Sequence, residues 1–199
     1  MSRELQKPKI LVFAGSTRTG SFNRMLARQT ARALERAGAE VTLIDLRDFA
    51  MPIYDGDTEA ATGLPEWAKR LKQLLREHDA FVIASPEYNG FFPALIKNVI
   101  DWASRAEAGE RSAQVFRGKV AGLVSASPGA GGGTRGLRHL RELLQNIGVD
   151  VVAEEVSIAR AHEAFDSEGR LVRPEHLDAI ESFASAVTAA AANRYAMAV

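Results

Sequence analysis

The fold is decided by the stretch Gly15-Ser16-Thr17-Arg18-Thr19-Gly20-Ser21-Phe22-Asn23. It follows an apolar run at residues 10–14 and precedes a segment in which alanine and leucine recur with helical spacing as far as Leu34. The stretch is therefore a strand-to-helix turn. Such a turn directs the unpaired N–H groups of the first helical turn, and the positive end of the helix dipole, toward one place, which favours a phosphate.

The residue types in this turn indicate which phosphate it suits. Gly15 and Gly20 have the spacing of a nucleoside-triphosphate loop, but Ser21 stands where that loop needs lysine. The dinucleotide fingerprint Gly-x-Gly-x-x-Gly fails too, because position 17 is threonine. Several hydroxyls with one cation, Arg18, suit a terminal monophosphate such as that of flavin mononucleotide (FMN). The alternative is an ordinary polar turn that Ser21 or Asn23 caps.

Composition narrows the class of protein. The chain has 199 residues, of which 46% are hydrophobic, so we expect one domain over residues 1–199. Its 25 basic and 25 acidic residues balance, which argues against nucleic-acid and membrane partners. There is no cysteine, and the four histidines form no ligand motif, so we expect no metal site. A polar N-terminus without a long apolar run makes the cytoplasm the expected location.

Apolar runs alternate with helical patterns along the chain. The patterns predict strands at 10–14, 40–45, 80–84, 120–124 and 149–153, and helices that open near Phe22, Pro65, Pro93, Leu137 and Pro174. Residues 49–63 suggest an irregular loop, and residues 105–117 a polar surface connection. The order predicts an α/β fold, a doubly wound five-stranded parallel sheet with helices on both faces. We assume the flavodoxin-like strand order 2-1-3-4-5.

Three loops rich in small or polar residues follow strands, at residues 15–23, 85–92 and 125–133. Loops that follow parallel strands leave the sheet at one edge, and strands 1, 3 and 4 are neighbours in the assumed order. We therefore expect the three loops to form one site. The first would hold a phosphate, and the other two would flank a planar ring.

The second and third loops each have a simpler interpretation. Asn89-Gly90 is a strong turn signal, and Glu87 beside it has no sign of a shifted pKa, although it could serve as an acid or a base. Gly131-x-Gly133-x-x-Gly136 matches the dinucleotide fingerprint, but a glycine-rich loop yields such matches readily. We expect these glycines to approach a flat ligand closely. Hydrolase chemistry is disfavoured because Gly-x-Ser-x-Gly is absent.

With these loops in place, the chain resembles the NADPH-dependent FMN reductase family, flavodoxin-like enzymes that include quinone, chromate and azo reductases. The resemblance covers most of residues 9–150, and it is carried by Gly15-Ser16-x-Arg18-x-x-Ser21-x-Asn23 and by Pro86-Glu87-Tyr88-Asn89-Gly90 with Pro93, Lys97-Asn98 and Asp101-Trp102. It implies that the FMN phosphate is held by Ser16, Arg18, Ser21, Phe22 and Asn23. It implies that the isoalloxazine is bordered by Pro86, Glu87, Tyr88, Asn89 and Gly90, with Ser127 on its other edge.

The resemblance also implies an activity and an assembly. The activity would be FMN-dependent NAD(P)H oxidation, in which hydride passes by a ping-pong route from NADPH or NADH to the flavin and then to a small acceptor, either quinone-like, flavin, azo or metal-oxyanion. The cofactor carries the reactivity, so we name no catalytic side chain. Family members are commonly homodimers or homotetramers, and the 95–102 helix and the alanine-rich last helix are candidate contacts.

Two other functions stay open at this point. A flavodoxin-type electron carrier would bind FMN without using pyridine nucleotide, although such carriers usually have a strongly charged docking face, and this chain is neutral. A Rossmann-type NAD(P) enzyme would use the Gly131 loop instead.

Overall fold

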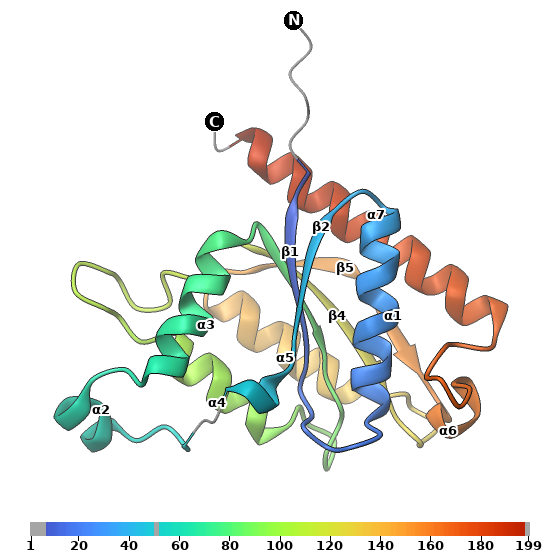
Figure 1. Ribbon diagram of the computed structural model, residues 1–199, viewed down its shortest axis with the longest axis horizontal. Coiled ribbons are helices and arrows are strands. Elements are labelled where there is room, and N and C mark those ends of the chain that lie inside the picture. The colour runs from blue at the N-terminus through green and yellow to red at the C-terminus, as the bar shows by residue number, and fades with distance from the viewer. Residues whose placement is uncertain (1–6, 50–51, 198–199) are drawn as a thin grey trace, which may run out of the picture.

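The computed structural model describes residues 7–49 and 52–197, and its centre is a parallel sheet of five strands (Figure 1). The strands are β1 (Lys9–Ala14), β2 (Glu40–Ile44), β3 (Ala80–Ala84), β4 (Val120–Ala126) and β5 (Asp150–Ile158). They lie in the order β2-β1-β3-β4-β5, and each pair is parallel. The predicted fold class and strand order are therefore confirmed.

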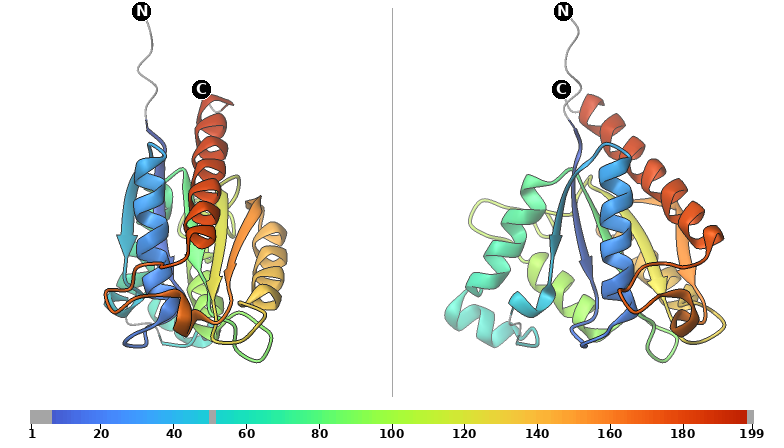
Figure 2. Two further views of the ribbon diagram at one scale, coloured as in Figure 1. Left: turned by 90° about the vertical axis from the view of Figure 1, so that its right-hand side faces the viewer. Right: turned by 45° about the vertical axis from the view of Figure 1, so that its right-hand side comes forward.

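Helices cover both faces of the sheet. They are α1 (Phe22–Arg36), α2 (Gly56–Thr62), α3 (Glu66–Glu77), α4 (Ala94–Ala103), α5 (Thr134–Asn146), α6 (Ala161–Ala164) and α7 (Pro174–Met197), with a short 3₁₀ helix, η1, at Leu46–Asp48. Helices α1 and α7 pack on one face, and α3, α4 and α5 on the other (Figure 2). Successive β1 residues point to opposite faces, so Ile10 and Val12 join one core layer, and Leu11 and Phe13 join the other.

Two segments differ from their predictions. Residues 49–63 contain the helix α2, which begins after Asp55, whose Oδ1 accepts a hydrogen bond from the Thr58 N–H at 2.7 Å. The helix buries none of its residues, so the sequence shows no apolar stripe there. In the segment 105–117, Val115 and Phe116 are buried against the sheet, so this segment is more than a surface connection.

Strand β5 is longer than predicted and irregular. Its register with β4 shifts between Ala121 and Leu123, where β5 bulges. There the guanidinium of Arg141 donates to the carbonyls of Val151 at 3.1 Å and Val152 at 2.7 Å. At the bulge these carbonyls of β5 thus accept hydrogen bonds from Arg141 of α5, where the regular pairing of β5 with β4 is interrupted. The second half of this edge strand was not predicted, because Glu154 and Glu155 interrupt the apolar run.

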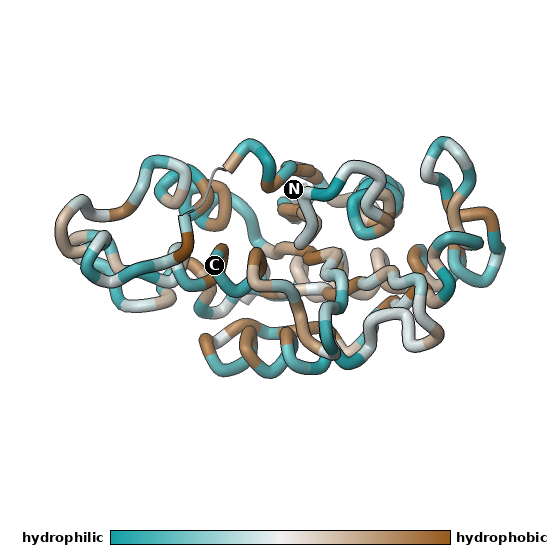
Figure 3. Tube along the Cα trace, turned by 90° about the horizontal axis from the view of Figure 1, so that it is seen from below, coloured by the Kyte–Doolittle hydropathy of each residue, from teal (hydrophilic) through white to brown (hydrophobic). Residues whose placement is uncertain are grey.

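The two rims of the sheet differ. Strand β1 begins and α7 ends at one rim, whereas the loops after β1, β3 and β4 emerge at the opposite rim (Figure 1). Viewed from the loop rim, the helices alternate between hydrophobic and hydrophilic residues around a mainly hydrophobic middle layer (Figure 3). In the part of the chain that the structure describes, no helix is long and apolar enough to cross a membrane.

Candidate active site

The first loop is shaped by close packing and by a helix cap. The N–H of Gly15 donates to the carbonyl of Ala84 at 2.9 Å, and a Cβ at this glycine would come within 2.6 Å of Cγ1 of Ile96. Ser21 caps α1, since its Oγ accepts from the N–H of Arg24 at 3.4 Å. The N–H groups of Phe22 and Asn23, also in the first turn of α1, have no acceptor within the helix among the described residues, so they can donate to an anion.

Asn23 fastens the first loop to the third. Its Nδ2 donates to the carbonyl of Ala126 at 2.8 Å, and its Oδ1 accepts from the N–H of Ala126 at 3.0 Å. The side chain is 3% exposed. Both polar ends of the side-chain amide thus bind the third loop, and the backbone N–H of Asn23 stands in the first turn of α1. That Asn23 helps to hold the phosphate stays a prediction, and its backbone N–H is the group best placed for that role.

The second loop contains a two-residue turn. Asn89 and Gly90 have positive φ angles of 54° and 81°, and Tyr88 and Phe91 exchange backbone hydrogen bonds at 2.9 and 3.0 Å. This is the geometry of a tight hairpin turn, which Asn-Gly favours. Asn89 and Gly90 stand at the tip of the loop, outside the pocket described below. These two residues shape the loop, and that they also border the ligand ring stays a prediction.

Glu87 joins the second loop to α5. Its Oε1 accepts from Nη2 of Arg135 at 2.8 Å, and its Oε2 accepts from the N–H of Gly136 at 3.0 Å. Burial raises the pKa of Glu87, but the hydrogen bonds from Gly136 and Arg135 outweigh it and hold the pKa below its usual value. The carboxylate is ionised at neutral pH and caps the N-terminus of α5 by accepting the N–H of Gly136.

The glycines of the third loop pack against protein atoms. A Cβ at Gly133 would overlap the side chain of Ser125, and one at Gly136 would lie 3.3 Å from the carbonyl of Phe91. These contacts account for the two glycines by packing within the protein, and close approach of the loop to a flat ligand stays a prediction. The fingerprint from Gly131 to Gly136 also leaves no dinucleotide site, because the carboxylate of Glu87 already occupies the N–H of Gly136.

The three loops enclose one pocket of about 430 Å³. Its lining is Ser16, Arg18, Ser21, Phe22, Asn23, Pro86, Glu87, Tyr88, Ala126, Ser127 and Pro128. All the predicted site residues except Asn89 and Gly90 therefore line this one pocket. Ala126 and Pro128 were missed, although they flank Ser127 in the sequence.

The donors and surfaces of this pocket fit a singly phosphorylated flat ligand. Ser16, Ser21 and the first turn of α1 gather hydroxyl and N–H donors at one end. Arg18 adds a cation there, with its Nη2 donating to the carbonyl of Gly20 at 3.1 Å. Tyr88 and the prolines supply apolar surface at the other loops. Among the described residues no group of three or more histidine and acidic side chains could hold a metal ion.

A doubly wound sheet of this order, with a turn rich in N–H and hydroxyl donors after β1 and a pocket where three loops meet, is the architecture of flavodoxin-like proteins. The chain belongs to the NADPH-dependent FMN reductase family, whose model matches residues 8–163. It is an NAD(P)H oxidoreductase that uses FMN as its cofactor.

Individual relatives agree with this family. The chain is 38% identical over 165 residues to an NAD(P)H-dependent FMN reductase of Pseudomonas aeruginosa, covering 82% of this chain and 84% of that one. It is 37% identical over 145 residues to a quinone reductase of Escherichia coli, covering 72% and 71% of the two chains. Among solved structures, FerB, an NAD(P)H:(acceptor) oxidoreductase of Paracoccus denitrificans, superposes with a TM-score of 0.80 at 27% identity, covering 94% and 98%. These matches give no support to the electron carrier.

Proposed function

We propose that this enzyme passes electrons from NAD(P)H to a quinone or a similar small acceptor while FMN occupies the pocket between the three loops. The observation that carries the proposal is the pocket itself, where the first turn of α1 and the hydroxyls of Ser16 and Ser21 meet the walls of the second and third loops. The names of the relatives, FMN reductase and quinone reductase, support a quinone or free flavin as acceptor.

Each group of residues has a distinct task in this proposal. Ser16, Ser21, Arg18 and the first-turn N–H groups bind the phosphate. Pro86, Tyr88 and Ser127 position the ring. When bound, FMN accepts a hydride from the nicotinamide and passes the electrons to the acceptor. Alignment of the reacting groups is the main contribution of the protein. Glu87 keeps the loops in place, because its oxygens are held by α5.

The surface beside the pocket supports a broad acceptor range and a dimer. Tyr88 is 54% exposed and Phe91 is 48% exposed, so the site has an open apolar margin. An open margin offers few contacts that discriminate among acceptors. We propose that a second copy of the chain covers part of this margin. The inner faces of α4 and α7, by contrast, pack into the core of their own chain.

The purified protein tests the proposal directly. It should be yellow, release FMN on denaturation, lose its flavin absorbance quickly when mixed anaerobically with NADPH or NADH, and regain it on addition of a quinone. A yellow protein that neither nucleotide reduces would contradict the proposed reaction while leaving the flavin site intact. A colourless protein that also fails to take up added FMN would contradict the site.

A further inference from the structure

The two edge strands of the sheet, β2 and β5, differ in how they are protected. At β5 a bulge interrupts the ladder, and the guanidinium of Arg141 donates to the carbonyls of Val151 and Val152. Features of this kind keep a further strand from pairing with an edge. Strand β2 has a continuous register with β1, and its sequence EVTLI contains neither proline nor lysine. The β2 edge is therefore open to pairing.

The backbone of β2 presents unpaired groups along this edge. The N–H of Glu40 donates to the carbonyl of Pro8 at 2.9 Å, so the backbone groups of Glu40 point toward β1. Because these groups alternate in direction along a strand, the N–H and C=O of Val41 and Leu43 point away from the sheet. None of the described residues pairs with them. They can hydrogen-bond to an extended chain laid alongside β2.

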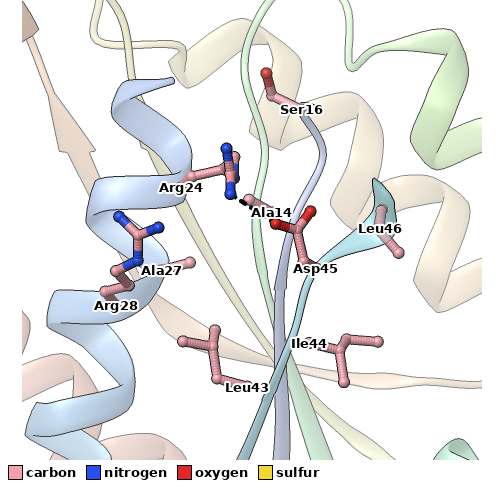
Figure 4. A pocket seen from close by; sticks show the side chains of 9 residues that line it. All are labelled: Ala14, Ser16, Arg24, Ala27, Arg28, Leu43, Ile44, Asp45 and Leu46. Carbon is pink, nitrogen blue, oxygen red and sulfur yellow. Dashed lines mark hydrogen bonds and ion pairs between the residues drawn. The ribbon is translucent and has the colours of Figure 1, made fainter. Parts of the chain in front are cut away.

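A pocket lies next to the open edge, between α1 and the end of β2 (Figure 4). Its lining is Ala14, Ser16, Arg24, Ala27, Arg28, Leu43, Ile44, Asp45 and Leu46, and we call it the β2 pocket. Its volume is about 160 Å³. Sites for whole small molecules usually measure about 300–1,000 Å³, so this pocket is better suited to one side chain.

The β2 pocket has one cation more than it has anions. Nη2 of Arg24 lies 2.6 Å from Oδ2 of Asp45, so these two charges neutralise each other. Arg28, an exposed residue one turn further along α1, forms no ion pair with any of the described residues. In Figure 4 the side chains of both arginines extend from α1 toward β2. The pocket therefore favours an incoming carboxylate.

The register of β2 predicts which side chains an added strand would need. Residues opposite each other in neighbouring strands share a face, so a residue paired with Leu43 would direct its side chain into the β2 pocket. The next residue would lie beside Ile44, which packs against the apolar core layer on the other face. An acidic residue thus suits the first position and an uncharged one the second.

The same register argues against a second copy of β2 as the occupant. Two β2 strands paired through their open edges would place Val41 and Leu43 opposite the same two residues of the other copy. No carboxylate would then reach Arg28.

We propose that the β2 edge is a docking site for an extended segment of a partner protein in which acidic residues alternate with uncharged ones. Val41 and Leu43 provide the main-chain hydrogen bonds, and Arg28 pairs with an acidic side chain in the β2 pocket. Ser16 lines both the β2 pocket and the three-loop pocket, so the docked segment lies beside the first loop. This site is separate from the proposed reaction.

Defined peptides and the holoprotein test the proposal. Fluorescence anisotropy should show that a labelled, amidated peptide Ser-Glu-Val-Glu-Val-Glu-Ser binds with a Kd of about 10–100 μM, weakening as salt is added. The rearranged peptide Ser-Glu-Glu-Glu-Val-Val-Ser, and a version with lysine in place of glutamate, should bind at least about 10-fold more weakly. With the first peptide bound, the amides of Val41 and Leu43 should exchange hydrogen more slowly.

Two pairs of variants separate the charge from the backbone. Arg28→Ala should weaken peptide binding about 5- to 20-fold, because a charge-assisted contact is lost. Arg32→Ala, an exposed position further along α1 and outside the pocket lining, should bind like the parent protein. Leu43→Pro removes an open N–H and should abolish binding, whereas Leu43→Thr keeps that N–H and should retain most of it. Flavin content and circular dichroism check that each variant folds.

Three results would each overturn the proposal: equal affinity for the two glutamate–valine peptides, equal losses in Arg28→Ala and Arg32→Ala, or unchanged exchange at Val41 and Leu43. Absence of binding up to about 1 mM peptide would overturn it too. If the protein instead self-associates, and Leu43→Pro dissociates it, a second copy is the occupant and the partner segment is refuted. Should Leu43→Pro fail to fold, Arg28→Ala and hydrogen exchange decide.

Discussion

At the scale of single residues, Asn23 and Glu87 each hold one loop of the pocket against another part of the chain. Asn23 exchanges two hydrogen bonds with Ala126, and Glu87 accepts hydrogen bonds from Arg135 and Gly136. Both side chains line the pocket, yet their polar atoms are directed to the protein. The pocket wall is therefore fixed before a ligand arrives, which lowers the ordering cost of binding.

Removing the amide of Asn23 should destabilise the fold. In Asn23→Ala the buried N–H and carbonyl of Ala126 both lose their partner, which should lower the free energy of unfolding by about 2–4 kcal/mol. Urea unfolding measures this loss. The control is Asn193→Ala, in which the replaced side chain is exposed on α7. If the two variants were equally stable, the hydrogen bonds between Asn23 and Ala126 would not contribute to the free energy of unfolding.

A negative charge at the cap of α1 should expel the cofactor. In Ser21→Glu the new carboxylate would stand where we place the FMN phosphate, and like charges in a pocket repel strongly. The purified variant should contain far less FMN per chain than the parent protein, measured from the absorbance of flavin released on denaturation. Ser112→Glu, at an exposed position away from the pocket, should retain its flavin. Full flavin content in Ser21→Glu would place the phosphate elsewhere.

At the scale of elements, the segment 105–117 is tied to α3 by a buried lysine. Nζ of Lys72, whose side chain is fully buried, lies 2.7 Å from Oε2 of Glu110 and 3.0 Å from Oε2 of Glu107. It also donates to the carbonyl of Arg105 at 2.6 Å. The hydrogen bond from Lys72, opposed by burial and assisted by Arg76, lowers the pKa of Glu110 to about 2.

This ion pair gives the protein a specific sensitivity to acid. The pKa of Glu110 is lower in the folded protein than its ordinary value of 4.5, so its contribution to stability is complete above that pH and is lost as pH falls toward 2. Glu110→Gln should cost about 1.5–3 kcal/mol near pH 7, since Glu107 still pairs with Lys72.

Urea unfolding at pH 7 and pH 3 checks this expectation. The variant should lose less stability than the parent protein between the two values, whereas Glu168→Gln, on an exposed loop, should follow the parent protein. A parallel pH dependence in Glu110→Gln and the parent would show that Lys72 does not depend on this carboxylate.

The elements also show what the sequence alone could reveal. Apolar runs marked β1, β3, β4 and the first part of β5, whereas partial alternation marked β2, whose residues are half-buried or exposed. Helix α2 was missed because it buries none of its residues, so no period marked it. The second half of β5 was missed because Glu154 and Glu155 interrupt the apolar run before the buried Val156 and Ile158. The proximity of Arg24 to Asp45 was missed for another reason. Arg24 and Asp45 are ordinary charged residues in the sequence, and only the pairing of β1 with β2 brings them together.

At the scale of the whole molecule, the exposed apolar margin of the pocket is the feature that bears on assembly. Phe91 stacks on His139, with ring centroids 4.3 Å apart, and stays nearly half exposed. If a second copy covers this margin, Phe91→Glu should shift the protein toward monomer in light scattering after gel filtration. Val172→Glu, at a similarly exposed apolar position near the start of α7, serves as the control. A parent protein that elutes as a monomer at all concentrations would contradict the proposed dimer.

The opposite placement of the two rims has a practical consequence. Because β1 begins and α7 ends on the side away from the three loops, an anchor attached before β1 or after α7 would hold the enzyme with its pocket facing outward. Immobilised on a bead or an electrode in this way, the protein should stay accessible to nicotinamide and acceptor. Coupling through surface groups of the loop rim would instead bury the mouth of the pocket against the support.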